Sequence, residues 1–408
     1  MAGGGPFQWR RTVRDRIKTL YLDANGCGRQ VIRADTVLRG IFGYRDGAAP
    51  PWVLRRSRRV ADLFSYLRQF QAHVSYTIDW REAFCESPEL DVEMCNINNL
   101  VHYGRCLLTL RRYDLVVVSH AAAGDDMTLL LKSAQWLRRR RGKLVMFIGN
   151  EYDLLDEKIA FIGAVGAEFI CSQLPTPAAQ YLYRECGGSR ILSMPHALNP
   201  KVYQPRGRAE RPVDIGFIGD VYWPFVGDRE RTDLIEAFER EGERWGLRCQ
   251  IRKQRIARTE WAEFLNTCRG TIGAESGTYY LNDRGRLLAA AREYNLLQHP
   301  EASFDEVFEK FYRGQPREVS GKSISSRHFE PIGTKTCQIL LEGEYNGVLA
   351  ADEHYISVRK DRSNLDEAVR RFKDEAYRRA ITERAYEHVM ANHTYAHRVR
   401  SVLAAVGA

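Results

Sequence analysis

Short apolar runs alternate with longer amphipathic stretches along the first half of the chain. Thr19–Asp23, Tyr113–Ser119 and Lys143–Ile148 have the length and the Val- and Leu-rich composition of buried strands. Helical patterns such as Leu100–Arg111 and Asp126–Arg141 separate them. Strands that are apolar throughout and alternate with helices predict a parallel sheet that is covered by helices on both faces.

The same alternation begins again after residue 212. Val213–Ile218 predicts a strand, Arg231–Arg244 a helix and Thr336–Leu341 a further strand. The stretch before this restart is rich in proline and aperiodic, which predicts a linker. The expected fold class is therefore α/β, with two Rossmann-like doubly wound domains facing a central cleft. The predicted parts are a first domain 1–198, a linker 199–212, a second domain 213–392, and a C-terminal helix 393–408 that packs back on the first domain.

The composition excludes several classes of protein. Of 408 residues, 44% are hydrophobic and 28% are charged, which excludes a disordered chain, a collagen and a small disulfide scaffold. The nine cysteines are odd in number, scattered and without a CxxC, so we expect a reducing compartment. No apolar run approaches the roughly 18 residues that cross a bilayer, and no secretory signal is evident. The predicted location is the cytoplasm.

Basic residues outnumber acidic ones, 61 to 52, for a net charge of +9. An anionic partner is expected: a nucleotide phosphate, a lipid surface or a nucleic acid. Nucleic acid is disfavoured because basic and aromatic residues are not interleaved. The basic runs Arg55–Arg59 and Arg138–Arg141 suit either solvated helix ends or an anionic membrane surface.

The stretch Ser323–Thr336 holds the most informative candidates for binding an anion. A short helix over Arg327–Ile332 would present main-chain amides at its amino end, where phosphate groups bind readily. Arg327 and Lys335 would add full charges, and Glu330 would accept hydrogen bonds from ribose hydroxyls. The alternative is a capped structural helix with an Arg–Glu surface pair.

Other candidates follow the predicted strands of the second domain. Gly219 would let the backbone approach a ligand, and Arg229 and Arg231 would reach a phosphate or merely begin a solvated helix. The chain has neither a GxGxxG nor a P-loop here. Glu275 lies on a glycine-flanked loop after a strand, where it would bind sugar hydroxyls, act as a base, or form part of a turn.

The first domain offers polar residues at equivalent places. His120 follows one predicted strand, and Asn150 and Glu151 follow the next. Asn25 begins the turn after the first strand. A single histidine is more often structural than catalytic. The sequence has no HExxH motif, no DxD-like pair at a strand end and no clustered Cys and His residues, so no metal site is predicted.

Several of these segments resemble the C-terminal domain of GT-B glycosyltransferases, particularly the group 1 (GT4-like) and CgeB-like type. They are Arg327-His-Phe-Glu330 with Gly333, the strand Cys337–Leu341, the terminal Asn392–Arg398, the passage Leu192–Pro200 and the restart Asp214–Gly219. The resemblance covers about residues 190 to 400, and residues 1–190 match in architecture only. The chain departs from the pattern at Gln338, where many relatives carry a second Glu, and at Lys335, where a small residue is common.

The resemblance implies a glycosyltransferase that moves a sugar from a nucleotide-diphosphate sugar to a glycan, lipid-linked or small-molecule acceptor. It further implies retention of configuration, no metal, no cofactor, and a part in surface polysaccharide or glycoconjugate synthesis, peripheral to a membrane if the acceptor is lipid-linked. The predicted catalytic residues are His120 and Glu275. The predicted acceptor-side residues are Asn25, Asn150 and Glu151. The predicted donor-binding residues are Gly219, Arg229, Arg231, Ser326, Arg327, Glu330, Gly333, Thr334 and Lys335.

Two other functions remain open at this stage. A nucleotide-sugar epimerase of GT-B architecture would turn over the donor without an acceptor. A non-catalytic sugar-nucleotide-binding protein would bind the donor without transfer, and Gln338 in place of a Glu is the feature that keeps this alternative.

Overall fold

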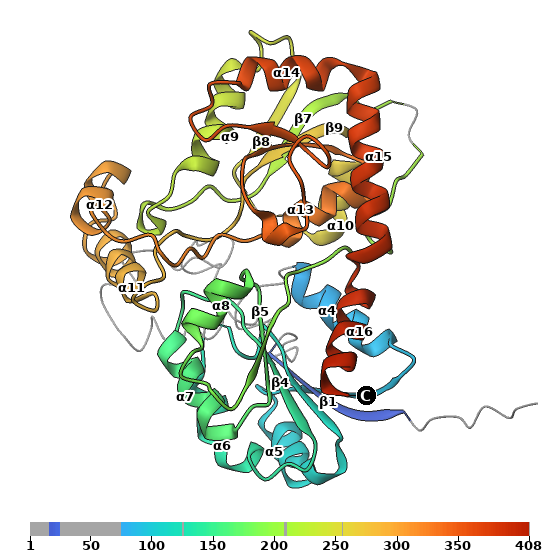
Figure 1. Ribbon diagram of the computed structural model, residues 1–408, viewed down its shortest axis with the longest axis vertical. Coiled ribbons are helices and arrows are strands. Elements are labelled where there is room, and N and C mark those ends of the chain that lie inside the picture. Colours follow the sequence, from blue (N-terminus) through green and yellow to red (C-terminus); the bar gives the residue numbers. More distant parts are fainter. Residues whose placement is uncertain (1–15, 25–74, 125, 208–209, 255, 408) are drawn as a thin grey trace, which may run out of the picture.

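A computed structural model describes residues 16–24, 75–124, 126–207, 210–254 and 256–407. Within these ranges the chain forms two parallel sheets, one in each lobe of the molecule (Figure 1). The fold class expected from the sequence, α/β with two Rossmann-like domains, is confirmed. The domain boundaries themselves stay predictions.

The first sheet has six strands in the order β2-β1-β3-β4-β5-β6. Alternate residues of its strands point to opposite faces, and both faces are buried: Val116 and Val118 of β3 join one core cluster, while Leu115 and Val117 join another. The strands are β1 (Ile17–Asp23), β2 (Leu90–Asn96), β3 (Leu115–Val118), β4 (Lys143–Phe147), β5 (Phe169–Ser172) and β6 (Arg190–Ser193). The helices of this part are α4 (Ser75–Glu86), α5 (Leu100–Leu108), α6 (Thr128–Leu137), α7 (Leu155–Val165) and α8 (Thr176–Leu182).

The second sheet has five strands in the order β11-β10-β9-β7-β8. All six residues of β7 and all five of β10 are buried, as expected for central strands that are covered on both faces. The strands are β7 (Val213–Ile218), β8 (Cys249–Arg252), β9 (Cys268–Gly273), β10 (Cys337–Leu341) and β11 (Ile356–Val358). The helices are α9 (Glu230–Glu241), α10 (Arg258–Leu265), α11 (Arg286–Glu293), α12 (Phe304–Phe311), α13 (Ser326–Gly333), α14 (Leu365–Lys373) and α15 (Glu375–Asn392).

The last helix returns to the first domain. After α15 the chain passes along the first lobe as α16 (Tyr395–Val406), which lies beside α4 (Figure 1). Val399 and Val402 of α16 are fully buried in the cluster that contains Trp80 and Phe84 of α4. This packing places α4 and α16 together against one face of the first sheet.

Some residues singled out in the sequence are not described by the structure. The basic run Arg55–Arg59 and Asn25 lie outside the described residues. The run Arg138–Arg141 follows the end of α6, and Arg140 donates to the carbonyl oxygens of Val165 and Gly166. None of the helices in the described ranges is long and apolar enough to cross a membrane.

Candidate functional site

A small pocket lies at the carboxyl edge of the second sheet. Its walls include the ends of β7 and β9 at Ile218 and Gly273, Ser325 at the amino end of α13, and the side chains of Arg231 and Arg327. The carboxyl ends of parallel strands are where α/β sheets bind ligands. The free volume is about 30 Å³, roughly the share of one water molecule, so a larger ligand requires the lining side chains to move.

His328 fixes the amino end of α13 at this pocket. The main-chain N–H of Ser325 donates to its Nδ1 at 3.0 Å, and its Nε2 lies 3.0 Å from the carbonyl oxygen of Ala274, just after β9. These partners define a neutral ring that is protonated on Nε2, and burial lowers the pKa of His328 to about 4. The positive end of the helix dipole is thereby held at the pocket.

Two arginines add positive charge at the same place. Arg231 of α9 lies against the rings of Phe217 and Tyr222, 5.5 and 5.3 Å from their centroids. Among the residues that the structure describes, no carboxylate forms an ion pair with it. The guanidinium of Arg327 lies 4.9 Å from the Trp261 ring and donates to the carbonyl oxygen of Ile218 at 2.9 Å. The pocket therefore combines two cations with a helix amino end, an arrangement that suits an anion.

Glu330 is placed differently from the sequence expectation of a ribose ligand. Its side chain is buried, and its Oε2 accepts a hydrogen bond from the indole nitrogen of Trp261 at 2.7 Å. Arg327 lies 3.9 Å from the same oxygen. The carboxylate does not line the pocket, so the ribose contact stays a prediction that requires the Trp261 indole to move aside.

Three further candidates lie at the opposite end of α13. Lys335 donates to both carboxylate oxygens of Glu383 in α15, each at 2.7 Å, and the Thr334 hydroxyl donates to the carbonyl oxygen of Pro331. Gly333 packs against Leu198 in the passage between the domains. Eight helical residues span about 12 Å, so these groups do not share the anion site at the amino end.

The remaining candidates of the second domain surround α9 and α13. Arg229 pairs with Asp233 at 3.0 Å, so its charge is directed along α9 rather than into the pocket. A Cβ at Gly219 would lie 3.5 Å from a terminal nitrogen of Arg231, so glycine there leaves space beside this guanidinium. Ser326 is buried in the first turn of α13.

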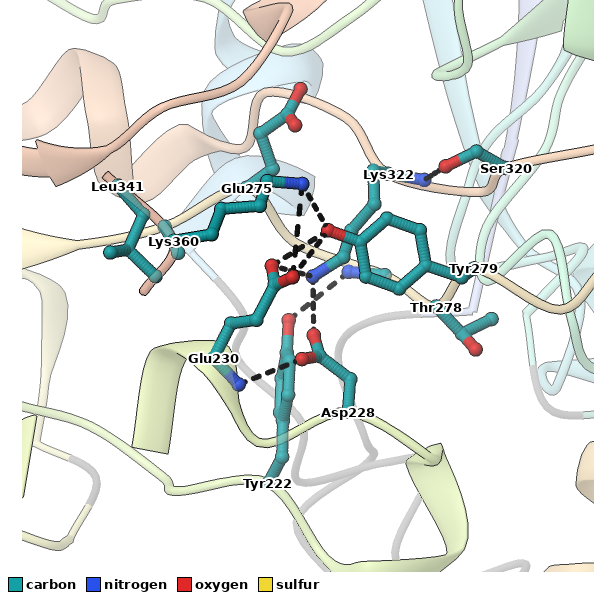
Figure 2. Close-up of polar contacts among 12 residues, drawn as sticks. Tyr222, Asp228, Glu230, Glu275, Thr278, Tyr279, Ser320, Lys322, Leu341 and Lys360 are labelled. Carbon is teal, nitrogen blue, oxygen red and sulfur yellow. Dashed lines mark hydrogen bonds and ion pairs between the residues drawn. The ribbon is translucent and has the colours of Figure 1, made fainter. Parts of the chain in front are cut away.

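A charge-balanced polar cluster lies near this edge, drawn in Figure 2. Lys322 pairs with the buried carboxylate of Asp228, and Tyr279 donates to Glu230 at 2.7 Å. Lys360 donates to the Tyr279 hydroxyl at 2.6 Å. Two carboxylates and two ammonium groups compensate one another. Sequence reasoning missed this cluster because its members come from four separated segments that share no motif.

Glu275 lies beside this cluster (Figure 2). Its Oε1 accepts a hydrogen bond from the main-chain N–H of Tyr345 at 2.7 Å. Burial raises the pKa of Glu275, while the charges of Lys322 and Lys360 oppose that change. A carboxyl with a raised pKa suits proton transfer, and the catalytic role of Glu275 stays a prediction.

The first-domain candidates are mostly buried. His120 packs 5.0 Å from Phe147 and 5.6 Å from Trp80, measured between ring centroids, and its Nε2 has no hydrogen-bond partner in the described part of the chain. Burial lowers the pKa of His120 well below its usual value.

The two other first-domain candidates that the structure describes support the loops after β4 and β5. Glu151 accepts hydrogen bonds from Ser172 at 2.7 Å, from the main chain of Gln173 at 2.9 Å and from Tyr183. The carbonyl oxygen of Asn150 accepts from Lys158 at 3.0 Å. These contacts hold the loops in place, and the acceptor-side roles of both residues stay predictions.

Comparison with known proteins gives a family match for the later part of the chain. Residues 229–404 match the family model described as glycosyl transferase-like. The resemblance seen in the sequence is thereby confirmed. The matched range contains Arg231, Glu275, Arg327 and Glu330. No curated protein sequence matches the chain.

Solved structures with related architecture include Anabaena Alr3699/HepE in complex with UDP-glucose, at 10% identity and a TM-score of 0.45, covering 96% of this chain and all of that one. Another is an alpha,alpha-trehalose-phosphate synthase (UDP-forming) from Burkholderia vietnamiensis, at 14% identity and a TM-score of 0.44, covering 96% of this chain and 99% of that one.

Proposed function

We propose that this chain is a glycosyltransferase that takes its sugar from a nucleotide-diphosphate donor, and that the pocket at the amino end of α13 receives the diphosphate. The observation that carries this proposal is the convergence of Arg231, Arg327 and the α13 amino end at one edge of the sheet. The family match over residues 229–404 includes all three.

The chemistry of donor cleavage explains why these groups suit the reaction. When the bond between the anomeric carbon and the diphosphate oxygen breaks, the electron pair stays on the diphosphate, whose negative charge grows in the transition state. Fixed guanidinium groups and main-chain amides aimed at that charge lower the barrier, since they need no reorganisation as it develops. Arg231 is the better placed of the two arginines, because no described carboxylate competes for it.

The small free volume of the pocket sets a condition on this function. A nucleotide sugar needs a site of several hundred Å³, and the pocket offers about 30 Å³. We infer that binding displaces Arg327 from the carbonyl oxygen of Ile218 and shifts the Trp261 ring beneath it. The hydrogen bond between the Trp261 indole and Glu330 would then break, and the Glu330 carboxylate would become available to the ribose.

We place the acceptor on the first domain, across from the donor. A glycan, a lipid-linked molecule or a small molecule would each meet the donor there, as in synthesis of surface polysaccharides or glycoconjugates. Binding to vesicles of anionic lipid separates the lipid-linked acceptor, which requires a membrane surface, from the other two.

The binding test starts from a thermal-shift panel of UDP-, GDP-, CMP- and dTDP-sugars, followed by titration of the donor that gives a shift. Arg231→Gln should weaken binding of that donor about 10- to 100-fold, the effect of losing a charge-assisted hydrogen bond. The matched control is Arg229→Gln on the same helix, whose guanidinium pairs with Asp233. If both substitutions weaken donor binding equally, or if neither weakens it, the diphosphate binds elsewhere.

Turnover assays then separate the three functions. A transferase releases the nucleoside diphosphate faster when an acceptor is supplied. Donor conversion to an epimer without acceptor would identify the epimerase instead, and tight binding without any turnover would identify a binding protein.

A further inference from the structure

Two cysteines and a histidine converge at the edge of the first sheet. The ligand atoms of Cys95, His102 and Cys106 all lie within 4.8 Å of one another. Cys95 belongs to β2, whereas His102 and Cys106 are four residues apart on one face of α5. Both thiols are buried, and the imidazole is 34% exposed, so solvent reaches the cluster from the His102 side.

Glu93 adds an oxygen to this group. It precedes Cys95 by two residues in β2 and therefore points to the same face of the strand. Its Oε1 lies 3.4 Å from Nε2 of His102 and 3.8 Å from Sγ of Cys106. Its Oε2 is held separately, by the Tyr113 hydroxyl at 2.6 Å and by Arg112. One carboxylate oxygen is thus anchored, and the other faces the cluster.

We propose that Cys95, His102, Cys106 and the Oε1 of Glu93 bind a single zinc-class divalent ion. Two thiolates, one imidazole and one carboxylate form a donor set that zinc takes in a tetrahedral arrangement. In such a site neighbouring ligand atoms are about 3.8 Å apart or closer, given Zn–S bonds of about 2.3 Å. The ligand atoms of Cys95, His102 and Cys106 must approach one another by up to about 1 Å, which rotation of the partly exposed His102 ring helps to supply, and Glu93 must turn its Oε1 towards Cys95.

Binding changes the protonation of the cluster. A cysteine thiol has an ordinary pKa of about 8.5, so each sulfur carries its proton at neutral pH when no metal is bound. The ion binds thiolates, so each sulfur forms a bond to the metal as its proton leaves to solvent, with two protons released per ion. No electron is transferred, and the step needs no other reactant.

The position of the site indicates a structural role. β2 is an edge strand, paired only with β1 among the described strands, and α5 packs on it. An ion that joins two ligands from β2 to two from α5 would fix this edge, as closed zinc sites do. This site is separate from the proposed donor pocket, which lies in the other domain, so the two proposals stand or fall independently.

The cluster of Cys95, His102 and Cys106 is not evident from the sequence. The spacing Cys-x6-His-x3-Cys contains no CxxC and matches no metal-binding motif, whereas the structure brings the three residues together. A turn between β2 and α5 brings the strand residue beneath the helix residues, and that proximity depends on tertiary structure rather than on spacing.

The test uses the full chain, purified under reducing conditions, stripped with a chelator and titrated with Zn²⁺ or Co²⁺ alone. We expect one ion per chain, a thermal midpoint that rises with added Zn²⁺, and, with Co²⁺, the thiolate charge-transfer and ligand-field absorption of a tetrahedral site. His102→Ala should weaken binding at least about tenfold, and Cys106→Ser should roughly halve the thiolate absorption per bound Co²⁺, since only the Cys95 sulfur remains.

The control is Cys186→Ser, which alters a buried free cysteine of the same domain outside the cluster. It should leave stoichiometry and spectrum unchanged. His102→Ala keeps both buried thiols and changes only a partly exposed ring, so it tests the site even if Cys106→Ser does not fold. Absence of stoichiometric binding by the folded, reduced protein would overturn the proposal. So would a Cys95–Cys106 disulfide that forms readily in air and is unaffected by prior loading with Zn²⁺.

Discussion

Gly333 occupies a position where a single methyl group has no room. A Cβ there would lie 2.5 Å from a methyl carbon of Leu198 and 2.5 Å from the carbonyl oxygen of Tyr203. The backbone oxygen cannot move without shifting the passage between the domains. The sequence placed Gly333 among the donor-binding residues, and the structure gives it a packing role as well.

The substitution Gly333→Ala should therefore lower the free energy of unfolding by about 1–3 kcal/mol, the usual cost of overpacking, as measured by chemical denaturation. The control is Gly163→Ala in α7, where a Cβ meets no heavy atom within 4 Å. That change should raise the free energy of unfolding by about 0.5–1 kcal/mol, because glycine is a poor helix residue. Similar effects at both positions would contradict this packing argument.

Residue types in the sequence identified charges but not their partners. Arg229 and Arg231 read alike in the sequence, as two cations at the start of one helix. Only the fold shows that Arg229 forms an ion pair with Asp233, whereas Arg231 lines the pocket. Likewise, the spacing of Arg327 and Glu330 predicted a surface pair or a ribose site, and it held no information on Trp261, which lies 69 residues away along the chain.

The helix α13 depends on one neutral histidine. His328 accepts from the amino end of its own helix and joins that helix to the loop after β9. Burial lowers its pKa to about 4, whereas in the unfolded chain a histidine titrates near 6.5. Between these values only the unfolded state binds the proton, so the contribution of His328 to stability is present above pH 6.5 and is lost as the pH falls towards 4.

Replacing this ring removes that pH dependence. Between pH 7 and pH 5, His328→Asn should lose about 2 kcal/mol less free energy of unfolding than the parent protein, from denaturation curves at both pH values. Asparagine keeps an acceptor for the main-chain N–H of Ser325. The control is His299→Asn, since the His299 side chain is 47% exposed. If the two variants show the same pH dependence, His328 is not the group responsible.

At the scale of elements, the pattern of apolar residues predicted the strands that are buried on both faces of a sheet. The central strands β3, β4, β7 and β10 were all expected from their apolar runs. The edge strand β2 was not, since its polar residues Asp91 and Glu93 interrupt the run and only two of its seven positions are buried. Three-residue β11 is too short for any period to appear.

At the scale of the whole molecule, ion pairs hold the two domains together. Arg284 and Arg286 near α11 both pair with Asp156 of α7, at 3.1 and 2.8 Å. On the side of α4, Arg258 of α10 pairs with Asp79 at 2.5 Å and with Glu82 at 2.7 Å. The sequence predicted two facing domains but could not predict these pairs, because their partners are 128 to 179 residues apart.

The pair of Arg258 and Asp79 is the most buried of these contacts. Asp79 is 1% exposed in its side chain, and Asn199 from the interdomain passage donates to it at 2.8 Å. Burial raises the pKa of Asp79 to about 7, while Asn199 and Arg258 oppose that rise. A raised carboxyl pKa means that stability falls as the pH rises from about 4 to about 7 and is constant above it.

Removing the Arg258 guanidinium should make the free energy of unfolding continue to fall at higher pH. In Arg258→Gln the buried carboxylate loses its counter-charge, so its pKa rises further and the folded protein must hold a proton above pH 7. The substitution should lower the free energy of unfolding by about 3 kcal/mol at pH 9 and by less at pH 6. Chemical denaturation at both pH values measures this difference.

Two comparisons make the interpretation specific. Adding Asp79→Asn to Arg258→Gln removes the uncompensated charge, so the double variant should regain stability at pH 9 and lose the extra pH dependence. Arg206→Gln breaks an ion pair with Glu263 in which both side chains are about half exposed, and it should cost under about 1 kcal/mol at either pH. If the cost of Arg258→Gln does not change between pH 6 and pH 9, Asp79 is not the group that the guanidinium compensates. The contact between α4 and α10 would then depend on Glu82, which is 35% exposed and could exchange Arg258 for water.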